Sequence, residues 1–329
     1  MTLKRLVTTV LLVTLGLAAT TLTACSKKTE SGSKKLTIAV IPSGSTDVYW
    51  QYVHAGALEA GKKLGVNIDF QGPVLDGDRN SQIQLVQNFI AEGVNGIVLA
   101  PCDPAALVPS VKQANAAHIP VVIMDSNLNG TPGKDFVSFV ATDNFKAGEK
   151  AGNFMAKLLG GKGKVVVLRF IVGNISTINR AKGFEAAIAK YPGIKIIANQ
   201  FGGSSPSLCQ QKAQDMLTDI QKADGVFCVN EISTFGMLRA LSQANLLGKK
   251  KFVGFDWQSN YVPAIKADQL NGVVVQNPVH MGYMAVKYVV DDIKGKSVPG
   301  TLDTGCVIVT PKNFATPAIQ QLVTVPKIP

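Results

Sequence analysis

The chain has 329 residues, a formal net charge of +11, and a hydrophobic share of 46%. This length is enough for two domains of ordinary size, each with its own core. A basic surplus can indicate nucleic-acid binding, but no dense block of basic residues occurs, and the dipeptides Lys27-Lys28 and Lys34-Lys35 lie in a short polar stretch. We therefore expect no nucleic-acid partner.

The N-terminus has the features of an export signal. A short basic start, Lys4-Arg5, precedes an apolar stretch over residues 6–20, and Leu22-Thr23-Ala24-Cys25 follows. The last four residues resemble a lipobox, at which bacteria acylate the cysteine and cleave before it. The alternative is a chance cysteine behind an ordinary signal. We expect residues 1–24 to be a lipoprotein signal peptide and 25–35 a lipidated tether. The protein would then lie in the cell envelope, periplasmic or extracytoplasmic, anchored to a membrane by lipid on Cys25.

Four further cysteines, at positions 102, 209, 228 and 306, show no CxxC spacing. An exported protein is able to form disulfides, but buried free thiols are an equally good interpretation. The sequence leaves both open.

From residue 36 onward, short apolar runs alternate with helical patterns. The predicted strands are 36–41, 66–70, 96–100, 121–124, 136–140, 164–170, 194–198, 225–229, 251–255, 272–275 and 306–310. The predicted helices are 49–64, 83–90, 105–117, 144–159, 180–190, 210–221, 233–244, 260–267 and 279–293. This alternation predicts an α/β protein with two similar doubly wound domains, each built on a parallel sheet wrapped by helices.

Planar polar side chains directly follow four of the apolar strands: Asp125 (with Ser126 behind it), Asn230, Asp256 and Gln276. Ligands bind at the carboxyl ends of the strands in doubly wound sheets. Any one of these residues is equally well explained as a helix cap or a turn residue. Together they predict a polar binding site.

Aromatic residues accompany this polar set. Tyr49 and Trp50 are adjacent at a predicted loop-to-helix junction, so we expect that they do not both face the core. Trp257 directly follows Asp256. Aromatic faces beside fixed planar polar groups suit a sugar, whose C–H face stacks on a ring while its hydroxyls are hydrogen-bonded. The alternative is an aromatic pair that covers an edge of the core.

Catalytic arrangements are poorly supported. The histidines at positions 54, 118 and 280 are isolated from one another, and the sequence has neither an HExxH nor a GxSxG motif. We therefore expect a protein that is not an enzyme, with no metal and no cofactor.

At the level of motifs, the chain resembles the periplasmic sugar-binding proteins of the ribose-binding type, the solute receptors of ABC importers. The matching pieces, between about residues 36 and 310, are Tyr49-Trp50 with Gly56-Ala57, Ile119-Pro120-Val121-Val122 leading to Asp125, Ala141-Thr142-Asp143-Asn144, Arg180-Ala181-Lys182-Gly183-Phe184, Asn230-Glu231 with Gly236, Val253-Gly254-Phe255-Asp256, and Gln276 with Gly282. The resemblance implies the type I periplasmic binding protein fold, in which three hinge crossings join two lobes. We place the crossings near residues 141–143, 276–278 and 303–305. The N-terminal lobe is then 36–141 plus 278–304, and the C-terminal lobe 142–277 plus 305–329.

The resemblance also implies which residues bind the sugar. They are Asp47, Tyr49, Trp50, Asp125, Ser126, Arg180, Asn230, Asp256, Trp257 and Gln276. Two of these positions depart from the ribose-binding pattern, because Ser126 stands where that pattern has arginine and Asp47 where it has asparagine. The loop 202–207 also lacks the aromatic residue of that pattern. Ribose itself is therefore not specified.

Taken together, these features predict a lipid-anchored, monomeric solute-binding protein. It would capture a monosaccharide, which is a pentose, a hexose or a related polyol, between two closing lobes. It would deliver that ligand to the permease of an ABC importer. The alternative is a receptor of the same fold that passes a sugar-like signal to a chemoreceptor or a sensor kinase.

Overall fold

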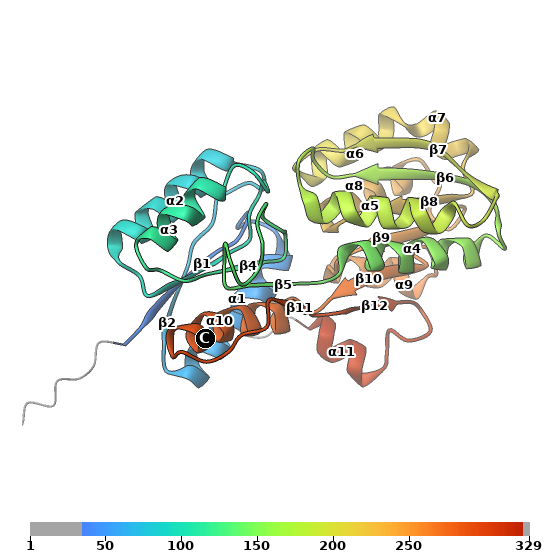
Figure 1. The fold of residues 1–329 in the computed structure, drawn as a ribbon. Coiled ribbons are helices and arrows are strands. Elements are labelled where there is room, and N and C mark those ends of the chain that lie inside the picture. Colours follow the sequence, from blue (N-terminus) through green and yellow to red (C-terminus); the bar gives the residue numbers. More distant parts are fainter. Residues whose placement is uncertain (1–34, 325–329) are drawn as a thin grey trace, which may run out of the picture. The chain divides into compact units, whose positions relative to one another are not determined.

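The computed structural model describes residues 35–324, which fold around two six-stranded sheets (Figure 1). The first sheet has the order β11-β5-β4-β3-β1-β2, with β1 (Thr37–Ile41), β2 (Asn67–Phe70), β3 (Gly96–Leu99), β4 (Val121–Met124), β5 (Ser138–Ala141) and β11 (Thr301–Asp303). The second has the order β12-β10-β9-β8-β6-β7, with β6 (Lys162–Arg169), β7 (Gly193–Phe201), β8 (Gly225–Cys228), β9 (Lys251–Phe255), β10 (Gly272–Gln276) and β12 (Cys306–Val309). All neighbouring strands are parallel except β10 and β12.

Helices cover both faces of the first sheet. One face carries α1 (Val48–Leu64) and α10 (Pro278–Ile293), and the other carries α2 (Arg79–Glu92) and α3 (Val108–Ala116). The alternation of side chains along β1 divides this core, because Ile38 and Val40 belong to the cluster with α1 and α10 while Ala39 and Ile41 belong to the cluster with α2 and α3. A strand segment buried on both faces must be apolar at every position, as residues 38–41 of β1 are.

The second sheet is covered in the same way. On one side lie α4 (Asn144–Leu158) and α5 (Ile175–Ile188), and on the other α6 (Pro206–Asp215), α7 (Leu217–Lys222) and α8 (Glu231–Gln243). The short helices η1 (Ser259–Tyr261) and α9 (Val262–Lys266) follow β9, and α11 (Pro317–Val323) follows β12. No helix within residues 35–324 has both the length and the apolar character needed to cross a bilayer.

The predicted fold class is confirmed, with three differences in detail. The segment expected as one helix over 210–221 is two helices, because the chain turns at Met216, whose backbone ends α6 and precedes α7. The strand β11 and the helix α11 were not predicted, since three and seven residues are too few for a periodic pattern to emerge. The last strand, β12, pairs antiparallel with β10, so the second sheet is not purely parallel.

The chain passes from one sheet to the other three times: between β5 and α4, between β10 and α10, and between β11 and β12. Hydrogen bonds join the first and third passages, because Thr142 Oγ1 donates to the carbonyl of Gly305 (3.2 Å) and the backbone N–H of Asp143 donates to Asp303 Oδ1 (3.0 Å). The predicted signal peptide and Cys25 lie outside the described residues. The cysteines at positions 102, 209, 228 and 306 are free thiols.

Glycines set the closest helix contacts, in the same way in each half of the molecule. A Cβ on Gly56 of α1 would lie 1.9 Å from the carbonyl oxygen of Val279 in α10, and one on Gly282 would lie 2.2 Å from that of Val53. In the second half, a Cβ on Gly148 of α4 would lie 2.1 Å from the Arg180 carbonyl oxygen. Only glycine permits backbones to approach this closely.

We predict that Gly183→Ala, in α5, lowers the free energy of unfolding by about 1–3 kcal/mol, since the added Cβ would lie 2.0 Å from the Phe145 carbonyl oxygen and must push α4 and α5 apart. Urea denaturation measures this change. The matched control is Gly300→Ala, whose Cβ would be 3.6 Å from its nearest neighbour, and it should change the free energy by less than about 0.5 kcal/mol. Equal stabilities for the two variants would contradict this account of the helix packing.

Candidate functional site

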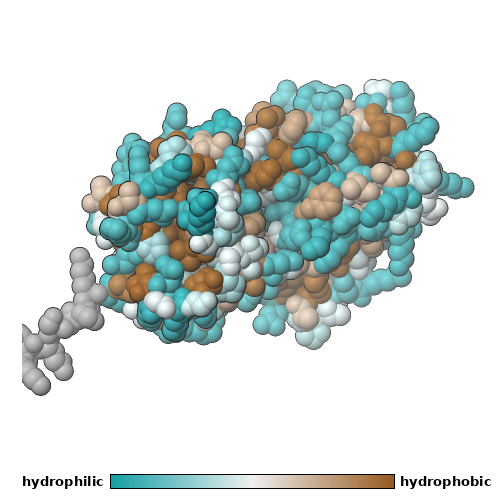
Figure 2. Space-filling view, in the orientation of Figure 1, coloured by the Kyte–Doolittle hydropathy of each residue, from teal (hydrophilic) through white to brown (hydrophobic). Residues whose placement is uncertain are grey.

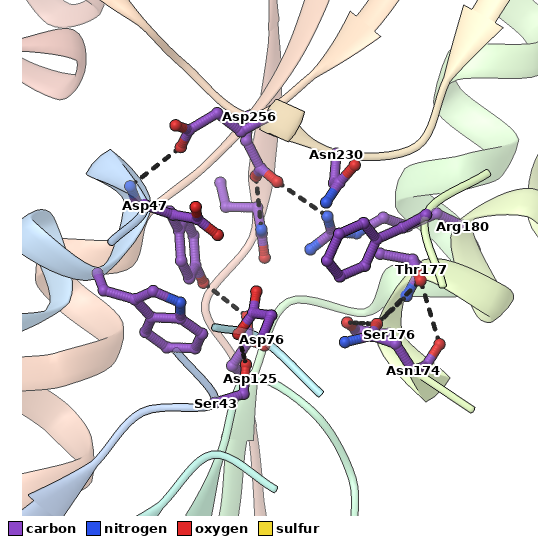
Figure 3. A pocket seen from close by; sticks show the side chains of 15 residues that line it. Ser43, Asp47, Asp76, Asp125, Asn174, Ser176, Thr177, Arg180, Asn230 and Asp256 are labelled. Atoms are coloured by element: carbon purple, nitrogen blue, oxygen red, sulfur yellow. Dashed lines mark hydrogen bonds and ion pairs between the residues drawn. The ribbon is translucent and has the colours of Figure 1, made fainter. Parts of the chain in front are cut away.

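A cavity lies between the carboxyl ends of strands from both sheets (Figure 3). Eight of the ten predicted binding residues line it: Asp47, Tyr49, Trp50, Asp125, Arg180, Asn230, Asp256 and Gln276. Its volume is about 40 Å³, against roughly 300–1,000 Å³ for typical ligand pockets, so a ligand of monosaccharide size needs the lining groups to move apart.

In each half of the molecule, an aspartate at the cavity has the same left-handed backbone conformation. Asp125 follows β4 and Asp256 follows β9, and both have a φ of +61°. The N–H of Asp125 bonds to the Val140 carbonyl (3.0 Å) and that of Asp256 to the Val274 carbonyl (2.8 Å). A non-glycine residue with this φ is uncommon, and such strain is typical of functional sites.

Arg180, the cation of the cavity wall, is held from several sides. Its Nη1 donates to Asp256 Oδ2 (2.9 Å) and to the Val229 carbonyl (3.1 Å), and its Nε donates to Asn144 Oδ1 (2.8 Å). The guanidinium carbon lies 4.0 Å from the centroid of the Phe255 ring. These contacts come from the ends of β8 and β9 and the start of α4, so the guanidinium is fixed before any ligand arrives.

The aromatic pair at the start of α1 is buried, and both of its members line the cavity. The expectation that Tyr49 and Trp50 do not both face the core is therefore wrong. The first turn of α1 borders the core and the cavity at once, so neighbouring residues reach the same enclosed space. Their rings meet edge to face at 5.0 Å, and the Tyr49 hydroxyl donates to Asp125 Oδ1 (2.7 Å).

Two predicted residues lie outside this cavity. Trp257 stacks on Phe314 (5.6 Å between ring centroids) and lines a separate small cavity. Ser126 is buried behind Asp125, and its hydroxyl has no hydrogen-bond partner among the described residues. A position next to a strand-end aspartate does not by itself place a side chain at the cavity, because the chain turns sharply after that aspartate.

Seven lining residues were not predicted: Ser43, Asp76, Phe170, Asn174, Ser176, Thr177 and Glu231. Ser43 and Glu231 follow the ends of β1 and β8, and the others lie in or just after the loops behind β2 and β6. Reading one to three residues past the end of every strand would have found Ser43, Phe170 and Glu231. The other four lie five or more residues beyond β2 or β6, so their positions depend on the paths of the loops.

Carboxyl groups crowd one side of the cavity. The side chains of Asp47 and Asp76 both line the cavity, and each perturbs the other electrostatically. Burial, together with neighbouring negative charge, raises the pKa of each to about 7. Burial also raises the pKa of Asp125 to about 6. Bringing carboxyl groups this close makes it costly for all of them to be charged at once.

Glu231, at the start of α8, caps the N-terminus of α1 from the other half of the molecule. Its carboxylate accepts from the backbone N–H groups of Tyr49 (3.1 Å) and Val48 (3.4 Å), and it also accepts from the Gln258 amide. Asp47, the residue at the N-cap position of α1, makes no capping bond of its own. Because orphan N–H groups at a helix start need an acceptor, this contact joins the two halves.

Comparison with known proteins gives the family. A family model described as a periplasmic binding protein domain matches residues 38–297. The ribose import binding protein of Salmonella typhimurium is 32% identical over 268 residues, which are 80% of this chain and 87% of that protein. The D-allose-binding periplasmic protein of Escherichia coli is 29% identical over 271 residues, which are 79% of this chain and 86% of that protein.

A solved structure agrees with these matches. The solute-binding protein of an ABC transporter from Agrobacterium vitis, with bound D-fucose, has a TM-score of 0.84 and 35% identity, and the match covers 88% of this chain and all of that one. The chain belongs to the periplasmic binding protein family. Membership of this family implies an extracytoplasmic location.

The carboxyl groups predict a specific dependence of stability on pH. The pKa values of Asp47, Asp76 and Glu231 are raised to about 7, above the roughly 4 expected when unfolded, so protonation favours the folded state. This stabilisation is complete below pH 4 and is lost as the pH rises through 7. The Tm of the ligand-free protein should therefore rise by about 2–5 °C when the pH falls from 8 to 6.5. The rise should be smaller in Asp76→Asn.

Calorimetric melts of both proteins between pH 8 and 6.5 measure this difference. The range stops at 6.5 because burial lowers the pKa of His54, and its protonation below that pH opposes folding. A Tm that falls over this range, or the same rise in both proteins, would contradict the assignment.

Proposed function

We propose that this protein is a solute-binding protein that captures a monosaccharide, which is a pentose, a hexose or a related polyol, and delivers it to an ABC importer. The observation that carries the proposal is the cavity between the two sheets, where fixed polar groups and aromatic rings converge. The relatives named for ribose and D-allose and the structure with bound D-fucose support the same ligand class. The protein would act by binding and release, not by catalysis.

The ligand groups divide between two lobes, taken as residues 36–141 plus 278–304 and 142–277 plus 305–329. Asp125 and the aromatic pair belong to the first lobe, Arg180 and Asn230 to the second, and Gln276 to a passage between them. A sugar would make its full set of hydrogen bonds only when both lobes contact it, so binding shifts the equilibrium toward closure. Glu231 supports closure, since its bonds to α1 form only when the lobes meet.

The polar groups that are free to bind a sugar include a hydrogen-bond acceptor on one lobe and a donor on the other. Asn230 uses its Oδ1 to cap α8, accepting from Ser233, which leaves its amide N–H₂ as a donor. Asp125 uses Oδ1 for Tyr49 and has Oδ2 as an acceptor. A hydroxyl both donates and accepts, and it therefore satisfies an acceptor on one lobe and a donor on the other.

Exposed apolar side chains in two loops that border the cavity would offer a surface to the permease. The molecular surface is mainly hydrophilic (Figure 2), but large hydrophobic side chains are exposed in loops after β2 and β6, among them Val74, Leu75 and Val172. A Cβ on Gly77 would lie 2.9 Å from Ile171 Cδ1, so the two loops touch. Since the loops belong to different lobes, an apolar patch made by both would distinguish the closed protein from an open one.

The protein would act as a monomer, held to the membrane by lipid on Cys25. The motif Leu22-Thr23-Ala24-Cys25 and the polar residues 26–35 support this part of the proposal. A short tether would keep the receptor at high local concentration around its permease.

For ligand binding, we predict that one or more sugars from a panel of pentoses, hexoses and polyols bind with 1:1 stoichiometry in isothermal titration calorimetry. Asp125→Ala and Asn230→Ala should each weaken that binding by about 2 kcal/mol or more, because each leaves a ligand hydroxyl without its partner. The matched control is Asn153→Ala in α4, outside the cavity, which should bind as the wild type does. Absence of heat and of thermal stabilisation across the whole panel would remove the sugar proposal.

For the anchor, we predict that mass spectrometry of the mature protein from a bacterial membrane fraction finds an acylated N-terminal Cys25. Cys25→Ser should remain unprocessed, because the motif lacks the thiol that receives lipid. An unmodified Cys25 in the wild-type protein would contradict the lipoprotein proposal.

A further inference from the structure

The cavity wall carries far more carboxyl groups than cationic groups. Five carboxyl groups line it, on Asp47, Asp76, Asp125, Glu231 and Asp256, against the single guanidinium of Arg180. Arg180 is ion-paired with Asp256 (2.9 Å). Within residues 35–324, the other four carboxyl groups have no ion pair with a lysine, an arginine or a histidine.

Asp76 is built into this wall by the loop after β2. Its Oδ1 accepts from the hydroxyl of Ser43 (2.5 Å), and it lines the cavity together with Trp50 and Asp47. A Cβ on Gly44 would lie 2.6 Å from Asp76 Oδ1, so a glycine at that position allows the carboxyl group to approach. The position of Asp76 is therefore shaped by its neighbours, and its carboxyl group lies near that of Asp47.

The amide oxygen of Gln276 is a second, independent observation that points to a ligand with hydrogen-bond donors. The Gln276 amide donates to Asp256 Oδ1 (2.7 Å), which fixes its orientation, because the reversed amide would set oxygen against a carboxylate. Its Oε1 is buried, lines the cavity and has no hydrogen-bond partner among the described residues. The cavity therefore holds an unsatisfied acceptor besides its carboxyl groups, and a ligand must bring a donor to it.

Asp47 and Asp76 are half-buried, and an unpaired negative charge that is partly removed from water is costly. A proton or a cation offsets that cost. A neutral sugar hydroxyl donates one hydrogen bond and brings no charge. An ammonium group brings three donors together with a positive charge. It satisfies Asp47 and Asp76 together, and it lets both carboxyl groups ionise.

Resting on the proposed function, we propose that the ligand is an amino-substituted sugar or polyol whose ammonium group lies against the carboxyl pair of Asp47 and Asp76. Asp47 and Asp76 would then favour ligands that carry a positive charge over neutral ones. Sugar acids and sugar phosphates are excluded by the same wall, since they would add negative charge to it.

Calorimetry at pH 7 tests this with matched ligands: glucose, galactose and mannose, each beside its 2-amino and 6-amino derivatives and its N-acetylated 2-amino derivative. For at least one sugar, an amino derivative should bind at least tenfold more tightly than the parent, and N-acetylation, which removes the charge, should abolish the advantage. In Asp47→Asn and in Asp76→Asn, the ratio of the two dissociation constants should fall below about threefold. The control Asp69→Asn, a carboxylate outside the cavity, should keep the full ratio.

The outcomes separate this inference from the function on which it rests. If a neutral sugar binds and none of its amino derivatives binds more tightly, the ligand class is wrong while the sugar receptor stands. If the amino advantage survives in both Asp47→Asn and Asp76→Asn, the carboxyl pair is not its origin, and the inference is overturned. If no compound in this hexose panel binds, the inference fails, while the proposed function is decided separately by the wider panel of pentoses, hexoses and polyols.

Discussion

The buried guanidinium of Arg180 is the group on which the rest of the site depends. It bonds to Asp256 at the end of β9 and to Asn144 at the start of α4. Asp256 in turn accepts from Gln276, at the end of β10, and the Asn144 amide donates to the Asp125 backbone carbonyl (3.5 Å). The partners of Arg180 therefore link it, through Asn144, to Asp125 in the first lobe and, through Asp256, to Gln276 at the passage after β10. Removing Arg180 would leave Asp256 as an uncompensated buried charge, which is among the costliest single changes in a protein.

The two halves of the molecule position an aspartate at the cavity, and pack their helices, in the same way. Each places an aspartate at a left-handed turn after a strand, and each brings two helices together through glycines. The difference lies in what the halves offer a ligand, since acceptors dominate around Asp47 and Asp76 while the donors come from Arg180 and Asn230. A ligand between them is oriented by this polarity as well as by shape.

Part of the site could be predicted from the sequence because ligands bind at the carboxyl ends of parallel strands, so a polar residue directly after an apolar strand is a candidate. We call this the strand-end rule. It found Asn230 and Asp256 because each follows an uninterrupted apolar strand, and the same rule misplaced Trp257, one residue further on. Asp76 could not be found in this way, since it lies six residues beyond β2 and reaches the cavity only through the path of its loop. The role of Glu231 was also hidden, because its partners are backbone N–H groups distant in the sequence. The alternation of elements was a stronger signal, and it failed only at short or interrupted segments such as β11.

In the proposed function, a sugar lies between the lobes with its hydroxyls shared by groups from both. A crystal structure with the tightest-binding sugar tests this placement. We expect the sugar to lie within hydrogen-bond distance of Asp125 from one lobe and Asn230 from the other, and to supply a donor to Gln276 Oε1. A sugar bound outside this cavity, or one held by a single lobe, would contradict this placement.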